Sequence, residues 1–322
     1  MNDEAINYVM WKMSDRLDNS QMIRLQQTLE EAFRGDRKGP EKSSEELLEH
    51  FLATKRLEGR SEKTLSLYRY SMERMLAKTD KNVCVMSTDD IREYLSTYRE
   101  QSGASKSTVD SIRRNLSSFF RWLEDENYIF KSPLRRIHKI KTTIAVKETY
   151  ADEDLERLRD ACVELRDLAI IDVLNSTGIR VGELINLDIS DVDFDERECI
   201  VLGKGDKERM VYFDARTKLH LQKYLESRSD DNPALFVSIR KPYRRLYISG
   251  VEIMLRKRGH SSRVNHVHPH KFRRTLATMA IDRGMPIEQV QKLLGHERID
   301  TTLQYAMVKQ TNVKMAHKKL MG

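Results

Sequence analysis

Four amphipathic segments follow one another between residues 43 and 130, and none of them shows the alternation of a strand. Each begins with a serine that can cap a helix, namely Ser43, Ser61, Ser87 and Ser107. An acidic residue stands three positions after three of these serines, as in a capping box: Glu46, Asp90 and Asp110. Apolar residues then recur every three or four positions, which is the period of an amphipathic helix. Four helices of this length can close one small core, so we predict a compact helical domain at 43–130.

Shorter helical patterns precede this domain. Residues 1–34 contain two predicted helices, and Gly35 ends the second. The stretch 35–42, GDRKGPEK, contains two glycines and a proline but no apolar residue, so it is predicted to be a linker. The 1–34 extension lacks the basic excess of a DNA-reading arm, which leaves open both an accessory DNA contact and packing onto a neighbouring protein.

The composition changes sharply at residues 131–147, KSPLRRIHKIKTTIAVK. This stretch contains six Lys and Arg residues and no acidic one. We predict a basic interdomain linker, and two interpretations of it stay open: a solvated tether, or a strap that lies on phosphates.

Residues 148–322 combine helical patterns with one hairpin, predicted at 198–213. Its segments ECIVL and ERMVYF alternate or run apolar, and the glycine-containing stretch between them supplies turn residues. The later helices are predicted at 215–227, 247–258, 268–283, 286–294, 300–307 and 310–320. The predicted fold class is therefore mainly α with a small antiparallel sheet (α+β).

Composition excludes several classes of protein. No apolar run reaches the roughly 18–20 residues that a membrane span needs, so neither a membrane protein nor an exported one is expected. The three cysteines, Cys84, Cys162 and Cys199, are too far apart for a disulfide scaffold or a zinc ribbon, which indicates a cytoplasmic location. The net charge of +7 permits a polyanionic partner without demonstrating one.

The densest group of chemically active side chains is HVHPHKFRRT at 266–275. Pro269 suits the first position of a helix, which places His270 in the first turn and Arg273 one turn later. A guanidinium matches two phosphate oxygens, so this pair can form an anion site beside a helix N-terminus. A basic helix face that contacts only solvent would show the same pattern of residues. A metal site on the three histidines of HVHPH is a further alternative, but the proline interrupts the spacing, and we predict no metal.

A second motif, STGIRVGEL at 176–184, places Arg180 at the start of a short helix and Glu183 three residues later. Glu183 can hold Arg180 through a hydrogen bond, although an ordinary surface salt bridge has the same spacing. Lys204 lies in the hairpin turn GKGDK, which lacks the spacing of a nucleotide-binding P-loop. A lysine there can also serve only to keep the turn soluble.

A third motif, LLGHERIDTTLQY at 293–305, places Gly295 where a helix can end and His296 directly after it. Asp300 can cap a short turn that presents Tyr305. A lone exposed tyrosine is usually only a surface residue, so this motif is weak when taken alone.

In this order and at these distances, the motifs resemble the tyrosine recombinase family, which includes the phage integrases and the Xer-like site-specific recombinases. The resemblance covers roughly residues 43–320, and its most specific part is H-x-x-R followed by L-G-H-x8-Y. It implies an enzyme that cleaves and rejoins DNA without metal, ATP or any other cofactor.

The resemblance implies a role for each matching position. Tyr305 is expected to attack a scissile phosphate and form a 3′-phosphotyrosine. Arg180 and Arg273 are expected to hold the non-bridging oxygens, and His296 to add a hydrogen bond.

The remaining roles concern proton transfer and support. Lys204 is expected to protonate the leaving 5′-oxygen and His270 to assist proton removal from the tyrosine, while Glu183 supports the cluster without touching the phosphate. Two positions depart from the family pattern: Lys271 stands where an acidic or small polar residue is common, and Arg274 where a histidine is common. Neither carries a catalytic role, so the departures concern only the local charge.

The resemblance also implies the partners: a double-stranded DNA recombination site held as in a clamp, and a homotetramer on two duplexes. The helix predicted at 310–320 would dock on a neighbouring copy, and an accessory protein or partner recombinase is compatible with this scheme. The expected location is cytoplasmic and nucleoid-associated. The predicted phosphate contacts are Lys106, Arg113, Arg114, Arg135, Arg136, Lys139 and Lys141.

Three other functions are compatible with parts of this pattern. A type IB topoisomerase shares the tyrosine, arginine and histidine chemistry but relaxes supercoils as a monomer. A DNA-binding regulator without catalysis and a metal-dependent hydrolase built on HVHPH are the other two. The sequence specifies neither the target DNA nor whether the reaction is integration, excision or dimer resolution.

Overall fold

The computed structural model describes residues 2–17, 19–33, 42–129, 131–141, 148–203 and 208–304. The chain divides into two units, Met1–Ile144 and Ala145–Gly322. Two predicted catalytic residues, Tyr305 and Lys204, lie outside the described residues, as does the helix predicted at 310–320. Among the described residues, no helix has both the length and the apolarity to span a membrane.

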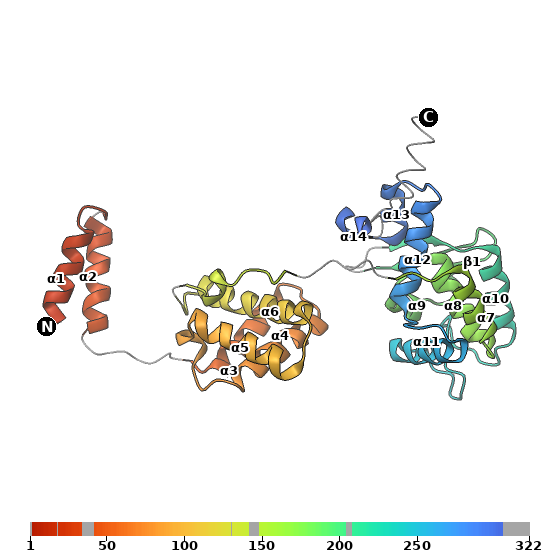
Figure 1. The fold of residues 1–322 in the computed structure, drawn as a ribbon, viewed down its shortest axis with the longest axis horizontal. Helices are drawn as coiled ribbons and strands as arrows, with labels where there is room; N and C mark the ends of the chain where they lie inside the picture. The colour runs from red at the N-terminus through yellow and green to blue at the C-terminus, as the bar shows by residue number, and fades with distance from the viewer. Residues whose placement is uncertain are drawn as a thin grey trace. The chain divides into compact units, whose positions relative to one another are not determined.

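The first unit begins with a helical hairpin, as the sequence predicts (Figure 1). Its two helices, α1 (Asn2–Met13) and α2 (Asn19–Phe33), contact each other. Ile6 is buried in this hairpin, whereas Trp11 is 68% exposed. A pair of helices this small cannot bury much apolar surface alone.

Four further helices follow, and a serine caps the start of each. Ser43 and Ser87 form the capping boxes expected from the sequence, with Glu46 and Asp90 as their partners. Ser61 caps the second helix by accepting from the backbone of Thr64. The helices are α3 (Ser44–Leu57), α4 (Glu62–Leu76), α5 (Thr88–Ser102) and α6 (Lys106–Asp125), with a short 3-10 turn, η1 (Val83–Val85), before α5.

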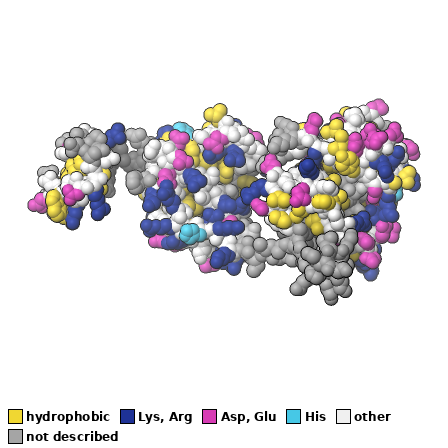
Figure 2. Space-filling model, turned by 90° about the horizontal axis from the view of Figure 1, so that it is seen from above, with side chains coloured by type: hydrophobic (Ala, Val, Ile, Leu, Met, Phe, Trp, Pro, Cys, Tyr) yellow, Lys and Arg dark blue, Asp and Glu magenta, His cyan; other side chains and the backbone are white. Residues whose placement is uncertain are grey.

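Aromatic side chains fill the core of this helical bundle. The ring centroids of Phe51 and Phe119 lie 5.3 Å apart in an edge-on arrangement, and both residues are fully buried. Truncating such a side chain to alanine typically costs about 3–5 kcal/mol of the free energy of unfolding. The surface is highly charged, with Lys and Arg standing among Asp and Glu on the face drawn in Figure 2.

The start of α6 differs from the prediction. Ser105, and not Ser107, caps the helix by accepting from the backbone of Thr108 at 3.1 Å. Asp110 is therefore not a capping residue. Its buried carboxylate instead accepts the backbone N–H of Ile140 at 3.0 Å and Nε of Arg113 at 2.9 Å.

Residues 131–141, predicted as part of a basic linker, pack onto the helical bundle. A 3-10 turn, η2 (Pro133–Arg136), buries Leu134 in the bundle core, and Ile137 and Ile140 pack against the same core. Thr88 donates to the carbonyl of Pro133 at 2.8 Å. Residues 131–141 are therefore anchored to the first unit through these apolar side chains, while their exposed basic residues leave a contact with phosphates as a prediction.

The second unit contains the predicted hairpin within a three-stranded antiparallel sheet of order β1–β2–β3. The strands are β1 (Val192–Asp193), β2 (Glu198–Leu202) and β3 (Glu208–Tyr212), and Cys199 faces Val211 across the β2–β3 pair. Around the sheet lie α7 (Asp152–Asp160), α8 (Leu165–Thr177), α9 (Val181–Asn186), η3 (Ile189–Asp191), α10 (Ala215–Glu226), α11 (Ile248–Ser262), α12 (Pro269–Asp282), α13 (Ile287–Leu294) and α14 (Ile299–Leu303). Helix α8 is the central element, because it contacts both α10 and α12.

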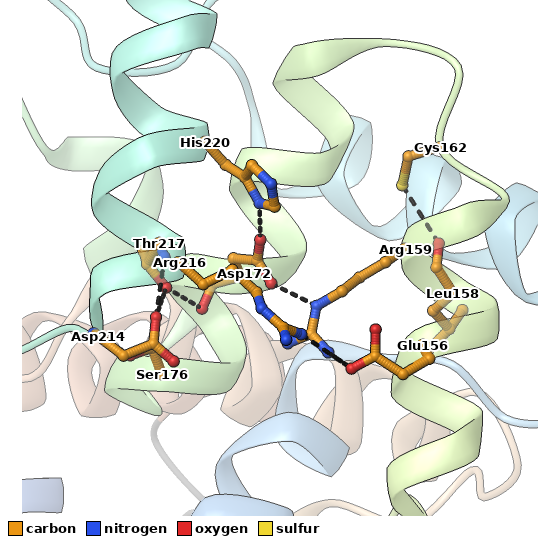
Figure 3. Close-up of polar contacts among 10 residues, drawn as sticks. All are labelled: Glu156, Leu158, Arg159, Cys162, Asp172, Ser176, Asp214, Arg216, Thr217 and His220. Carbon is orange, nitrogen blue, oxygen red and sulfur yellow. Dashed lines mark hydrogen bonds and ion pairs between the residues drawn. The ribbon is translucent and has the colours of Figure 1, made fainter.

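A polar network fastens α8 to α7 and α10 (Figure 3). The buried carboxylate of Asp172 accepts Nε of Arg159 at 2.7 Å and contacts Nδ1 of His220. At the end of α8, Ser176 accepts the backbone N–H of Asp214 at 2.8 Å. The network therefore fixes the C-terminal turn of α8, which leads directly to the predicted site residues.

Candidate active site

Arg180 follows a sharp turn at the end of α8. Gly178 ends that helix in the left-handed region, with φ +61°, and Arg180 is the capping residue of α9. The guanidinium of Arg180 donates to Glu183 at 2.8 Å and to the carbonyl of Gly295 at 3.1 Å. Because this side chain is 35% exposed, a bound anion can reach it.

Glu183 is the buried acceptor at the centre of the cluster. It accepts the backbone N–H of Arg180 at 2.8 Å and two hydrogen bonds of 2.7 Å from Arg209. Burial by itself raises the pKa of Glu183, but the hydrogen bonds from the two arginines outweigh it and hold the pKa below 4.5. Glu183 is therefore ionised at neutral pH and joins two cations.

Arg273 is buried on α12, one turn after Pro269, which occupies the first helical position as predicted. Its guanidinium donates to the carbonyl of Gly178 at 2.8 Å and to the carbonyl of Leu294. Arg273 therefore ties the C-terminal end of α8 to that of α13. Both contacts use backbone acceptors, so neither neutralises its charge.

His296 comes directly after the glycine that ends α13, again as the sequence predicts. Gly295 has φ +63°, and Nδ1 of His296 lies 2.9 Å from the hydroxyl of Thr302. Burial, together with the positive charges of Arg273, Arg180 and Arg209, lowers the pKa of His296 from 6.5 to about 4. The imidazole is therefore neutral at pH 7 and carries one N–H.

The described hydrogen bonds thus bring together four of the predicted site residues: Arg180, Glu183, Arg273 and, through the backbone of Gly295, its neighbour His296. His270 lies in the first turn of α12, three residues before Arg273, with an exposed side chain. Arg209 and Thr302 were not predicted from the sequence. A signal for Arg209 was present, because on β3 it shares the inward-facing parity of the buried Val211.

The three histidines of HVHPH alternate with two buried residues. His266 has φ +54°, and both His266 and His270 are exposed, whereas Val267 and Pro269 between them are buried. Within the described ranges there is no group of three His, Cys, Asp or Glu side chains that could hold a metal ion.

Lys271 and Arg274, the two departures from the family pattern, contact the segment before α7. Nζ of Lys271 lies 4.5 Å from the ring centroid of Tyr150 and donates to the carbonyl of Asn265 at 3.2 Å. Arg274 donates to the carbonyl of Glu148 at 3.0 Å. Both residues therefore fasten α12 to neighbouring backbone.

The predicted phosphate contacts of the first unit fall into two groups. Arg113 is only 12% exposed and paired with Asp110, and Arg135 is exposed but paired with Glu124. Arg114 is 65% exposed and lies 3.6 Å from the far oxygen of Asp110. The other predicted contacts, all exposed, are Lys106, Arg136, Lys139 and Lys141.

Comparison with known proteins identifies the family. A model described as "Phage integrase family" matches residues 148–312, and one described as "Phage integrase, N-terminal SAM-like domain" matches residues 47–129. The chain belongs to the phage integrase family. This recombinase is similar to the tyrosine recombinase XerC of Oceanobacillus iheyensis, with 34% identity over 244 residues that cover 71% of this chain and 79% of the relative. It is also similar to XerA of Pyrococcus horikoshii, with 30% identity over 278 residues that cover 85% and 93%.

A solved structure shares the fold of this recombinase across most of both chains. The XerH site-specific recombinase, in a post-cleavage complex with a palindromic difH substrate, has a TM-score of 0.68 at 19% identity and covers 97% of this chain and 93% of its own. The predicted family, the α+β fold class and the function of a site-specific tyrosine recombinase are thereby confirmed. The comparisons lend no support to the type IB topoisomerase or to the silent regulator.

Proposed function

We propose that this recombinase cleaves and rejoins the strands of a double-stranded DNA site through a covalent bond to Tyr305. The observation that carries the proposal is the fixed cation cluster, in which Arg180 and Arg273 are held by the carbonyls of Gly295, Gly178 and Leu294. Arg180 and Arg273 would hold two non-bridging oxygens of the scissile phosphate, and the single N–H of His296 would reach an oxygen as well.

The cluster supports this role because of its charge. A phenol with a pKa near 10 is a poor nucleophile at pH 7 unless positive charge stabilises the transition state. Guanidiniums that are already fixed need no reorganisation when negative charge develops on the phosphate oxygens, and losing one such donor typically costs about 10²–10³ in rate.

The proposed cleavage transfers a phosphoryl group from a 5′-oxygen of the DNA to Tyr305. The oxygen of Tyr305 bonds to phosphorus, the bond from phosphorus to the 5′-oxygen breaks, Lys204 gives that oxygen a proton, and His270 accepts the proton of the phenol. The phosphotyrosine ester conserves the phosphodiester bond, so a 5′-hydroxyl can reverse the step without ATP. For Tyr305 and Lys204, the support is the spacing of the sequence motifs.

The exposed basic residues on α6 and in the segment after it are the proposed phosphate contacts. Lys106, Arg114, Arg136, Lys139 and Lys141 are all exposed. The logarithm of the binding constant falls linearly with the logarithm of the salt concentration. Each phosphate that the protein neutralises is expected to make the slope of that line more negative by about 0.9. Arg113 is better suited to anchoring the residues after α6, because its guanidinium is largely covered and bound to Asp110.

We also propose a mode of assembly and a location for this recombinase. A tetramer on two duplexes, with residues 310–320 docked on a neighbouring copy, would let strands be exchanged between sites, and an accessory protein or partner recombinase is compatible with it. A cytoplasmic, nucleoid-associated location fits a DNA substrate. Deleting 310–322 should abolish cooperative assembly on DNA, and unchanged cooperativity would refute the docking.

Formation of a covalent adduct tests the proposed function. The protein first selects its site from a randomised duplex library, and the selected duplex is then nicked beside the cleavage position and labelled at the 5′ end. In denaturing gels the native protein should carry the label and Tyr305→Phe should not. Equal labelling of both proteins, or none with the native protein despite tight binding, would contradict the proposal.

A further inference from the structure

Arg209 on β3 donates hydrogen bonds to the carboxylate of Glu183, the same group that Arg180 contacts. Its two terminal nitrogens donate to the two oxygens of Glu183, at 2.7 Å each, and its side chain is only 13% exposed. A bidentate pair of this kind fixes the orientation of both groups. Glu183 also accepts from the guanidinium of Arg180 at 2.8 Å, so one carboxylate lies between two guanidiniums.

Arg209 also lies against the backbone that carries the next contact of Arg180. A Cβ atom placed on Gly295 would lie 2.7 Å from Cδ of Arg209 and 2.9 Å from its Nε. The side chain of Arg209 therefore occupies the space beside Gly295, whose carbonyl accepts from Arg180 at 3.1 Å. Arg209 thus touches both groups that hold Arg180.

The charges of these three side chains decide what Arg209 contributes. Without Arg209, the carboxylate of Glu183 would neutralise the guanidinium of Arg180. With Arg209 present, Glu183 is shared, and the cluster of the three keeps one net positive charge beside the backbone that bears His296. In the described part of the chain, Arg180 uses one N–H of each terminal nitrogen, which leaves its other N–H groups for a phosphate.

We propose that Arg209 is a positioning residue for the strand-cleavage reaction. It shares the carboxylate of Glu183 with Arg180 and packs beside Gly295. Arg180 is thereby held in position, and its positive charge is not fully neutralised when it binds the scissile phosphate. This inference rests on the proposed function of the cluster. It differs from a purely structural ion pair because it requires that the effect of Arg209 depend on the charge of Glu183.

A double-mutant cycle separates the two possibilities. The full-length protein, Arg209→Gln, Glu183→Gln and the double variant are compared by the single-turnover rate of covalent adduct formation on the selected, nicked duplex. We expect Arg209→Gln to slow the native protein by about 10–100-fold, less than the roughly 10²–10³ expected for a direct phosphate donor. In the Glu183→Gln background the same change should cost less than about 3-fold, because no carboxylate is left to neutralise Arg180.

Two further variants and the binding constant complete the experiment. Arg209→Lys, which keeps the charge and can still reach Glu183, should recover part of the rate and also serves if Arg209→Gln does not fold. Arg228→Gln is the matched control, since Arg228 belongs to the same unit, has a side chain that is only 6% exposed and makes a bidentate pair with Asp230. That control should lower thermal stability and leave the single-turnover rate of the folded protein unchanged. DNA affinity should change by less than about 3-fold in every variant.

The outcomes are distinguishable. If the native protein forms no adduct, the proposed function fails. If the native protein forms an adduct and Arg209→Gln is as fast, or slows the reaction equally with and without the carboxylate at position 183, the inference about Arg209 is wrong.

Discussion

The hydroxyl of Thr302 lies 2.9 Å from Nδ1 of His296. Thr302 is fully buried on the short helix α14, which ends at Leu303, two residues before Tyr305 in the sequence. This hydrogen bond therefore connects the imidazole that is proposed to bind the phosphate to the helix that precedes the proposed nucleophile. When Thr302 donates to Nδ1, the single proton of the neutral imidazole resides on Nε2, where it can be donated to an oxygen.

We expect Thr302→Val to reduce the rate of adduct formation by about 10-fold, because valine keeps the shape but removes the hydrogen bond that orients His296. Thr302→Ser retains the hydroxyl and should stay within about 3-fold of the native rate. Single-turnover cleavage of the selected duplex measures both. A valine variant that cleaves at the native rate would show that the hydrogen bond plays no part in orienting the imidazole.

The pKa of His296 can be measured directly. Burial and three neighbouring arginines lower it to about 4, so one of the nine imidazole signals in the NMR spectrum of the DNA-free protein should titrate near pH 4. That signal should be absent from His296→Gln. Titration of the assigned signal near 6.5 would contradict the described environment.

The lowered pKa of His296 also determines how the stability of the protein changes with pH. The unfolded chain takes up a proton at His296 near pH 6.5, whereas the folded chain does so only near pH 4. The contribution of His296 to the free energy of unfolding is therefore fully present above pH 6.5 and falls as the pH drops from 6.5 to about 4. We expect the native protein to lose stability faster than His296→Gln across that interval.

Gly295→Ala should impair both stability and cleavage. An alanine at φ +63° is strained by about 1–2 kcal/mol, and its Cβ would also lie 2.7 Å from Cδ of Arg209. Gly284→Ala is the matched control, since Gly284 also has positive φ but nothing within 4 Å of the added atom. The control should lower the melting temperature alone. Equal cleavage rates for the two variants would show that displacing Arg209 has no effect on the reaction.

Asp110→Asn should loosen the residues after α6. Burial raises the pKa of Asp110, but hydrogen bonds from Arg113 and the backbone of Ile140 outweigh it and hold the pKa below 3.8. The stabilisation is therefore present above about pH 4 and is lost as the pH falls further. Removing this charged acceptor should cost about 1–3 kcal/mol at pH 7.

Tryptophan fluorescence measures this loss selectively, because both tryptophans, Trp11 and Trp122, lie in the first unit and only Trp122 is buried. Asp89→Asn, which removes an exposed carboxylate paired with Arg92, is the control and should stay within about 0.5 kcal/mol of the native protein. If the two variants are equally stable, Asp110 does not anchor the segment.

Local patterns predicted much of this fold. Serine followed by an acidic residue marked the starts of α3 and α5, and the alternation of ECIVL with its partner strand predicted the β2–β3 hairpin. The start of α6 was misplaced because Ser105 and Ser107 are both capable caps. Asp110 was misread because its carboxylate accepts from Arg113 and from the backbone of Ile140, which lies 30 positions later.

The site residues that were predicted are those that stand in recognisable sequence motifs. Arg180, Arg273 and His296 stand in short motifs, and the structure joins them through the backbone of Gly178, Leu294 and Gly295. Arg209 and Thr302 were missed because their roles depend on tertiary contacts: β3 must lie against α9 before an arginine there can meet Glu183. An arginine at an inward-facing strand position needs a buried acid, and that rule would have identified it.

The most direct test of the account is to locate the nucleotide on the protein. The native protein is trapped on the nicked duplex, digested with protease and nuclease, and analysed by mass spectrometry. We predict that the remaining nucleotide is attached to Tyr305 through its 3′-phosphate and to no other residue. A nucleotide attached to a different side chain, or through a 5′-phosphate, would contradict it.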